Sequence, residues 1–133
     1  MKVVIDTNVL VSGLFFSGTP ARILKAWHTG QFQLLLSDEI LHEYKLVLHE
    51  MTQKKPVLNP QKIVSFIRHT AHFVKPVTLH HQVCTDKDDD KFIACALAAK
   101  AIIVTGDKAL LKTAGYKNLT VLTPSEFEQR YLI

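Results

Sequence analysis

The stretch Lys2-Val3-Val4-Ile5-Asp6 and its later counterpart Ala101-Ile102-Ile103-Val104-Thr105 decide the fold of this chain. Both runs are continuously apolar instead of alternating with polar residues, which is typical of strands buried on both faces of a parallel sheet. Helical segments separate three further strand-like runs, and Pro76 places one of these near an edge of the sheet. The sequence therefore predicts an α/β fold with parallel strands at residues 2–6, 32–36, 73–77, 101–105 and 120–122.

Capping residues mark where the intervening helices begin. Thr19-Pro20 predicts one start, with Thr19 as the N-cap and Pro20 at the first helical position, and Gly30 predicts the end of that helix. Ser37 and Asn59-Pro60 predict two further starts, the second for a helix that runs to about residue 71. Later helices are expected over residues 89–101, over residues 108–114 and after the capping box Thr123-Pro124-Ser125-Glu126.

The composition bounds the class of protein. The chain has 133 residues, of which 47% are hydrophobic and 21% charged, which is ordinary for a globular protein and favours a single domain over residues 1–133. Its formal net charge of +4 is compatible with an anionic partner such as nucleic acid. Five of the 12 acids lie within residues 86–107, so the rest of the chain is correspondingly more basic.

Neither the cysteines nor the apolar runs indicate export or a membrane. Cys84 and Cys95 do not make a disulfide framework and fit a reducing cytoplasm. The amino-terminal run leads straight into a strand and has no secretory hydrophobic region. The longest apolar stretch, residues 92–104, is broken by Lys100 and is too short to span a bilayer. A cytoplasmic location without membrane attachment is therefore expected.

Two acids are expected at the carboxyl edge of the sheet. Asp6 ends the first strand, and Asp107 follows the fourth after Gly106. Ligand sites in open parallel sheets lie outside the carboxyl ends of the strands. Asp6 also suits a turn, and Asp107 also suits the N-cap of the short helix after it. If the two strands are neighbours, the two carboxylates lie close together.

Further acids lie on predicted helices. Glu43 borders the buried stripe of its helix, and the alternative is a flanking side chain that reaches solvent. Asp90 shares a helical row with Ile93 on an almost wholly apolar helix, where a carboxylate is costly unless it is paired or bound to a metal. For Asp88, capping is the favoured interpretation, whereas Asp89 stays open between capping and the site.

Converging carboxylates repel one another, so a cluster of four is stable only when some are protonated or a cation neutralises them. Oxygen-only ligands suit Mg²⁺ or Mn²⁺, and the spacing of the seven histidines favours surface or partly packed roles over a metal site. The sequence has no Gly-rich phosphate loop, no Gly-x-Ser-x-Gly elbow and no cysteine placed as a nucleophile. The pattern therefore favours metal-assisted attack of water on a phosphodiester.

Four blocks cover almost the whole chain in a distinctive order and spacing: Val3-Val4-Ile5-Asp6-Thr7-Asn8-Val9-Leu10, Ser37-Asp38-Glu39-Ile40-Leu41-His42-Glu43, Asp89-Asp90-Lys91-Phe92-Ile93-Ala94-Cys95-Ala96 and Val104-Thr105-Gly106-Asp107. Together they resemble the PIN domain family, and within it the toxin components of toxin–antitoxin pairs. The resemblance implies a three-layer α/β/α sandwich with a parallel sheet of four or five strands. It also implies endoribonuclease activity that depends on Mg²⁺ or Mn²⁺.

The same resemblance implies the residues of the site. It places the acidic, metal-binding positions on Asp6, Glu43, Asp90 and Asp107. Asn8 and Thr105 match supporting positions that hydrogen-bond the acids. The run Asp88-Asp89-Asp90 offers more acids than the pattern needs, so Asp89 is a supporting residue that can also supply the third carboxylate in place of Asp90. The partners implied are RNA, a small antitoxin protein that covers the site, and a second copy of the chain in a homodimer.

The resulting hypothesis is a metal-dependent ribonuclease in which Asp6, Asp90 and Asp107 hold one divalent ion. Glu43 completes the shell of that ion or orients the attacking water, and cleavage leaves a 3′-hydroxyl and a 5′-phosphate, as the resemblance suggests. The basic residues expected on the rim, where they would hold the RNA backbone, are Arg22, Lys87, Lys91 and Lys108.

Two other functions stay open from the sequence. One is a metal-dependent phosphatase that uses Asp6 as a nucleophile, although Asn8 stands where a second Asp is usual in such enzymes. The other is a non-catalytic PIN-like module that binds RNA or a protein.

Overall fold

The computed structural model describes all residues from Met1 to Ile133 and contains one sheet of five parallel strands. The strand order is β3-β2-β1-β4-β5, so the first strand lies at the centre of the sheet, between the second and the fourth. In the central pair, Ile5 lies opposite Val104. The strands are β1 (Lys2–Ile5), β2 (Gln33–Leu36), β3 (His72–Phe73), β4 (Ile102–Val104) and β5 (Val121–Leu122).

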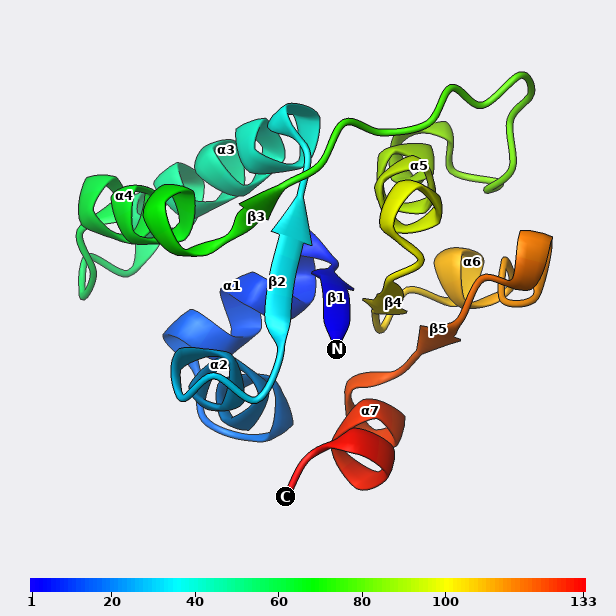
Figure 1. The fold of residues 1–133 in the computed structure, drawn as a ribbon. Helices are drawn as coiled ribbons and strands as arrows, with labels where there is room; N and C mark the ends of the chain where they lie inside the picture. The colour runs from blue at the N-terminus through cyan, green and yellow to red at the C-terminus, as the bar shows by residue number, and fades with distance from the viewer.

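Helices cover both faces of this sheet, and the predicted three-layer α/β/α fold is confirmed. Figure 1 shows the first four helices on one side of β1 and β2, and α5 and α6 on the other side. This division follows from right-handed crossovers, because the chain moves outward from β1 to β3 and then returns past β1 to β4 and β5. The helices are α1 (Thr7–Phe15), α2 (Thr19–His28), α3 (Asp38–Lys54), α4 (Pro60–Thr70), α5 (Asp90–Ala99), α6 (Lys108–Leu111) and α7 (Pro124–Tyr131).

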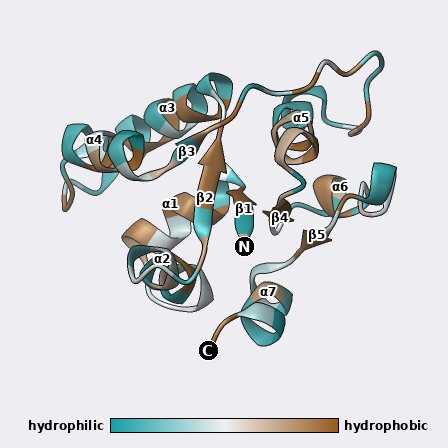
Figure 2. Cartoon of the chain, in the orientation of Figure 1, coloured by the Kyte–Doolittle hydropathy of each residue, from teal (hydrophilic) through white to brown (hydrophobic).

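The core lies between the sheet and the two helical layers. In β1 the side chains of Val3, Val4 and Ile5 are fully buried, as are those of Ile103 and Val104 in β4. Figure 2 shows hydrophobic residues along β2, β4 and β5 and hydrophilic residues on the outer surfaces of α3 and α4. Each fully buried aliphatic side chain contributes about 1.5–3 kcal/mol to the free energy of folding. The central strands are therefore held firmly, and so are the residues at their carboxyl ends.

No helix combines the length and the apolar character that a bilayer-spanning segment needs. Cys84 and Cys95 are both buried, and both are free thiols.

The predicted capping residues account for most helix starts. The Ser37 hydroxyl accepts a hydrogen bond from the Ile40 N–H, and the Asn59 side chain caps α4 in the same way. Thr123 and Glu126 form the predicted capping box at the start of α7. Gly30, with φ of 84°, directly follows the end of α2. These starts confirm the local reading of the sequence.

Three local predictions are corrected. A helix, α1, begins directly after Asp6, where the sequence suggested only a turn. Gly18 instead of Thr19 is the N-cap of α2, so that helix begins one residue earlier than predicted. The third strand is confined to His72–Phe73, because the chain leaves the sheet well before the predicted end at residue 77; it does lie at an edge, as expected.

Gly13 permits the close packing of α1 against α2. A methyl group at this position would lie 2.7 Å from the carbonyl oxygen of Pro20 and 2.7 Å from a methyl carbon of Leu24. Alanine favours an isolated helix by about 1 kcal/mol over glycine. Since backbone must shift to relieve this contact, we predict that Gly13→Ala lowers the free energy of unfolding by about 1–3 kcal/mol, measured by urea denaturation.

Gly106→Ala is the matched control, because no atom lies within 4 Å of the added methyl group. A higher unfolding midpoint for Gly13→Ala than for the unsubstituted protein would contradict this view of the α1–α2 contact.

Candidate active site

Asp6 and Asp107 meet at the carboxyl ends of two adjacent strands. The Asp6 N–H donates to the Val104 carbonyl at 3.0 Å, which aligns the end of β1 with the end of β4. Thr105 links the two acids, since its hydroxyl donates to Asp6 Oδ2 at 2.5 Å and accepts from the Asp107 N–H at 3.0 Å. Thr105 is fully buried, so this bridge has no competition from water. The supporting role predicted for Thr105 therefore has a physical basis in these two hydrogen bonds.

Glu43 reaches the same place from α3. Its Oε2 accepts a hydrogen bond from the hydroxyl of Thr7, the residue after Asp6. The next residue on α3, Tyr44, is fully buried and donates its hydroxyl hydrogen bond to the Ile5 carbonyl. Burial raises the pKa of the Tyr44 hydroxyl well above its usual range, so Tyr44 stays protonated and remains a donor. The second turn of α3 is thus fixed to the last residue of β1, and Glu43 is held beside Asp6.

Lys91 lies inside the cluster instead of on a rim. Its ammonium nitrogen is 2.7 Å from Glu43 Oε1 and 2.5 Å from the Asp88 carbonyl oxygen, to which it donates. The Lys91 side chain is only 8% exposed. The expectation that Lys91 holds RNA at the surface is therefore corrected: this lysine is the internal counter-ion of Glu43.

The two neighbouring acids at the start of α5 have different surroundings. Asp90 accepts hydrogen bonds from the Val83 and Cys84 N–H groups, at 3.1 and 2.7 Å, so both of its oxygens bind the preceding loop. Asp89 has a buried Oδ2 without a hydrogen-bond partner. The structure thus turns the Asp90 carboxylate towards the loop and directs Asp89 towards the other acids.

Mutual repulsion and burial show in the pKa values of the cluster. Burial raises the pKa of Asp6, the Thr105 hydrogen bond opposes this, and the charges of Glu43 and Asp107 add to it. Burial is also the largest cause that raises the pKa of Asp89 to about 7, followed by the adjacent Asp107 carboxyl and the charge of Asp6. These shifts connect Asp6, Glu43, Asp89 and Asp107 as one electrostatic unit.

The chemistry of this cluster fits a hard divalent cation. All candidate ligands are carboxylate oxygens, which Mg²⁺ and Mn²⁺ prefer, and the unpartnered buried Oδ2 of Asp89 is an atom that a cation would satisfy. The side chains do not yet form a group of three ligands around one point. Their charges and donor atoms, and not a preformed cage, are therefore the features that match a metal.

The other predicted residues lie outside the cluster. Asn8 is exposed and makes no hydrogen bond to the acids, so its supporting role is taken by Thr7. Arg22 forms a two-pronged ion pair with Glu128 of α7, with the shorter contact at 2.6 Å. It shares a surface hollow with Gln31, which shortly precedes β2, and so lies towards the amino end of the sheet.

Lys87 and Lys108 are exposed and flank the acids, since Lys87 precedes Asp89 by two residues and Lys108 directly follows Asp107. Both side chains are therefore accessible to solvent, and their contact with RNA stays a prediction. Arg22 is corrected, because its charge is already paired with a carboxylate on another helix.

Thr7 and Tyr44 are the site residues that sequence reasoning missed. Thr7 shares a helical row with Val11 and Leu14, so a helix that starts at residue 7 would have pointed it inward. Tyr44 lies on the buried stripe that Glu43 borders, one residue further along α3. A buried tyrosine needs a partner for its hydroxyl, and that requirement was the available signal.

Comparisons with known proteins bear on the family and the fold of the chain. The family model of the PIN domain matches residues 2–109. The chain is 33% identical to the uncharacterized protein MJ1680 of Methanocaldococcus jannaschii, over 98% of this chain and 92% of that protein.

Solved structures of similar fold include VapBC2 from Rickettsia felis bound to a DNA fragment from their promoter, with a TM-score of 0.60 at 13% identity, covering 92% of this chain and 98% of that one. PAE2754 from Pyrobaculum aerophilum has a TM-score of 0.63 at 13% identity, and the match covers 98% of this chain and 89% of that one. FitAcB from Neisseria gonorrhoeae has a TM-score of 0.57 at 16% identity, and the match covers 92% of this chain and 98% of that one. At these identities the likeness concerns the fold.

The contrast between Asp89 and Asp90 can be tested by stability. Asp90→Asn places an amide NH₂ against one of two backbone N–H groups, so we predict a loss of about 1–3 kcal/mol of unfolding free energy. Asp89→Asn removes a repelling charge, so the melting temperature at pH 8 in EDTA should stay equal or rise. Differential scanning calorimetry of both variants measures this, and the reverse order would show that the two roles are interchanged.

Metal-free protein should lose stability as the pH rises. The pKa of Asp89 is about 7 in the folded state against an ordinary 3.8, and that of Asp6 is also raised. Protonation therefore favours the folded state, and this contribution is complete below pH about 4 and is lost as the pH passes 7. In EDTA, the melting temperature should decrease as the pH rises through this range. The melting temperature of the Asp89→Asn variant should decrease less steeply. A melting temperature that rises over this range would contradict the assignment.

Proposed function

The chain belongs to the PIN domain family, and on that premise we propose that it is a metal-dependent endoribonuclease that hydrolyses RNA phosphodiester bonds. The observation that carries the proposal is the meeting of Asp6, Glu43, Asp89 and Asp107 at one end of the sheet, with the pKa of Asp89 raised to about 7. A binding module with no chemistry has no need for such mutual repulsion. The proposed set takes Asp89 in place of Asp90, because Asp90 is engaged by the loop at Val83 and Cys84.

Asp6, Asp89 and Asp107 are the proposed ligands for Mg²⁺ or Mn²⁺, with Glu43 beside them. When bound, such an ion supplies an activated water and neutralises charge on the phosphate. Thr105 keeps Asp6 and Asp107 in fixed relative positions through its two hydrogen bonds. Thr7 and Lys91 orient Glu43 beside the proposed ligands, where it can accept a proton from the attacking water.

Positive charge near the acids supports an RNA substrate. Lys87 and Lys108 are exposed on either side of the cluster and form no ion pair, so both are free to contact phosphates. Lys91 lies within the cluster and balances one carboxylate. Water attack in line with the leaving oxygen would release a 3′-hydroxyl and a 5′-phosphate.

We also propose a biological setting. The blocks that resemble toxin components, together with the fold shared with VapBC2 and FitAcB, support the role of a toxin held inactive by a small antitoxin protein. The same resemblance supports a homodimer in the cytoplasm. Arrest of growth on expression of the chain alone, relieved by a protein encoded beside it, would test the first part, and light scattering would test the second.

The nuclease activity makes a direct prediction. With Mn²⁺ or Mg²⁺, the purified protein should cleave single-stranded RNA, and EDTA should abolish the cleavage. Asp6→Asn removes a proposed ligand, so the rate should fall by at least about 10²-fold, the size expected for loss of an essential charge-stabilising group. Gel analysis of labelled RNA measures the rate, and end-labelling identifies the product termini.

Asp38→Asn is the matched control, because Asp38 is an exposed acid in the first turn of the same α3 that carries Glu43. It should cleave like the unsubstituted protein. Full activity in EDTA would reject the metal-dependent mechanism, and tight RNA binding without cleavage in saturating Mn²⁺ would favour a non-catalytic module.

A further inference from the structure

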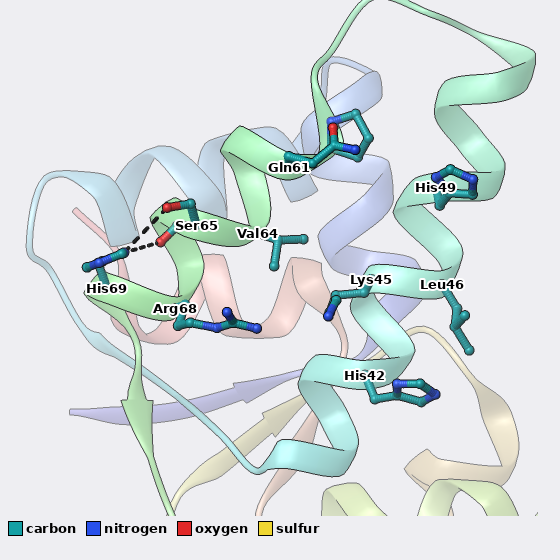
Figure 3. Close-up of a pocket in the computed structure, with 10 residues that line it drawn as sticks. His42, Lys45, Leu46, His49, Gln61, Val64, Ser65, Arg68 and His69 are labelled. Atoms are coloured by element: carbon teal, nitrogen blue, oxygen red, sulfur yellow. Dashed lines mark hydrogen bonds between the residues drawn. The ribbon is translucent and has the colours of Figure 1, made fainter.

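A groove between α3 and α4 lies outside the acidic cluster. It has a volume of about 490 Å³ and is lined by His42, Lys45, Leu46 and His49 of α3 and by Pro60, Gln61, Val64, Ser65, Arg68 and His69 of α4. Figure 3 shows the side chains of Lys45 and Arg68 extending into the space between the two helices, with Val64 facing α3 beside them. The groove is therefore open, apolar over much of its wall and cationic at its middle.

Charge in this groove is unbalanced. None of its ten lining residues is an acid, and neither Lys45 nor Arg68 forms an ion pair or a side-chain hydrogen bond. Two unpaired cations that face each other are stabilised when an anion binds between them. The groove is thus suited to an anionic ligand.

The groove begins beside the acidic cluster. His42 directly precedes Glu43 on α3, and Lys45 and His49 continue along that helix away from the acids. Since α4 returns antiparallel after a short connection, Arg68 near its end lies opposite the first half of α3. The groove and the acidic cluster are thus both carried by the first half of α3.

We infer that this groove binds the phosphate backbone of single-stranded RNA on one side of the scissile bond. The inference rests on the proposed nuclease function and adds a substrate-binding surface to it. Lys45 and Arg68 contact phosphates, and the exposed rings of His42 and His49 offer faces on which bases can stack. No acid lines the groove and two unpaired cations face each other at its middle, which favours a phosphate backbone over the apolar anchors of a protein partner.

The test is RNA affinity at several salt concentrations. A double variant, Lys45→Gln with Arg68→Gln, is made in the Asp6→Asn background so that no cleavage occurs. Binding of a fluorescent polyuridine RNA is followed by anisotropy. Loss of two phosphate contacts should weaken binding on the order of tenfold at low salt and reduce the slope of log K against log salt by about 1.4.

The control variant, Lys2→Gln with Lys25→Gln, removes the same charge from two exposed lysines outside the groove. It should lower affinity much less, and circular dichroism should show all variants folded. Equal affinities and salt slopes for the groove variant and the control would overturn the inference. The inference would also be overturned if the groove variant kept its RNA affinity but no longer bound an acidic protein that co-purifies with the unsubstituted chain. That result would identify the groove as a protein interface.

Cleavage assays separate this inference from the proposed function. With Asp6 intact, the groove variant should raise KM for long RNA while cleaving a trinucleotide, which is too short to fill the groove, at the unsubstituted rate. If the protein cleaves no RNA but its RNA affinity still depends on Lys45 and Arg68, the nuclease proposal is wrong and the groove inference holds. If the groove variant cleaves long RNA with an unchanged KM, the groove inference is wrong and the nuclease proposal holds.

Discussion

The bridge made by Thr105 between Asp6 and Asp107 is the constraint on which the rest of the site depends. Two carboxylates that emerge from adjacent buried strands would separate if they were free to move, because like charges repel. The buried hydroxyl donates to one and accepts from the backbone of the other, and the central strands that carry them cannot shift without opening the core. The packed core therefore holds the two carboxylates close together despite their mutual repulsion.

Two further elements complete the frame. Tyr44 ties α3 to the carbonyl of Ile5, and this places Glu43 against Thr7 and Lys91. The start of α5 contributes Asp89, whose unpartnered oxygen and raised pKa mark where positive charge is lacking. A single lysine cannot balance four acids, so the cluster favours a divalent cation. The groove of α3 and α4 has the opposite imbalance, and an RNA strand would meet both surfaces.

Sequence alone predicted the central strands, most of the capped helix starts and the carboxyl-edge position of Asp6 and Asp107, because these depend on local patterns. It misplaced the N-cap of α2 and the end of the third strand. It missed α1, since Asp6-Thr7-Asn8 is equally good turn chemistry, and with it the inward direction of Thr7. The separation of Asp89 from Asp90 depends on the path of the loop at Val83 and Cys84, which has no repeating pattern. The pairing of Arg22 with Glu128 likewise joins residues far apart in the chain.

The most direct measurement is a crystal structure of the protein soaked with Mn²⁺, with anomalous scattering recorded to locate the ion. Repulsion among the acids predicts one strong peak at about 2 Å from oxygens of Asp6, Asp89 and Asp107, at the carboxyl ends of β1 and β4. The contradictory result is no peak among these acids at saturating Mn²⁺, or a peak only at the surface histidines. Acids that tolerate their own repulsion without a cation would have a structural role and no part in RNA hydrolysis.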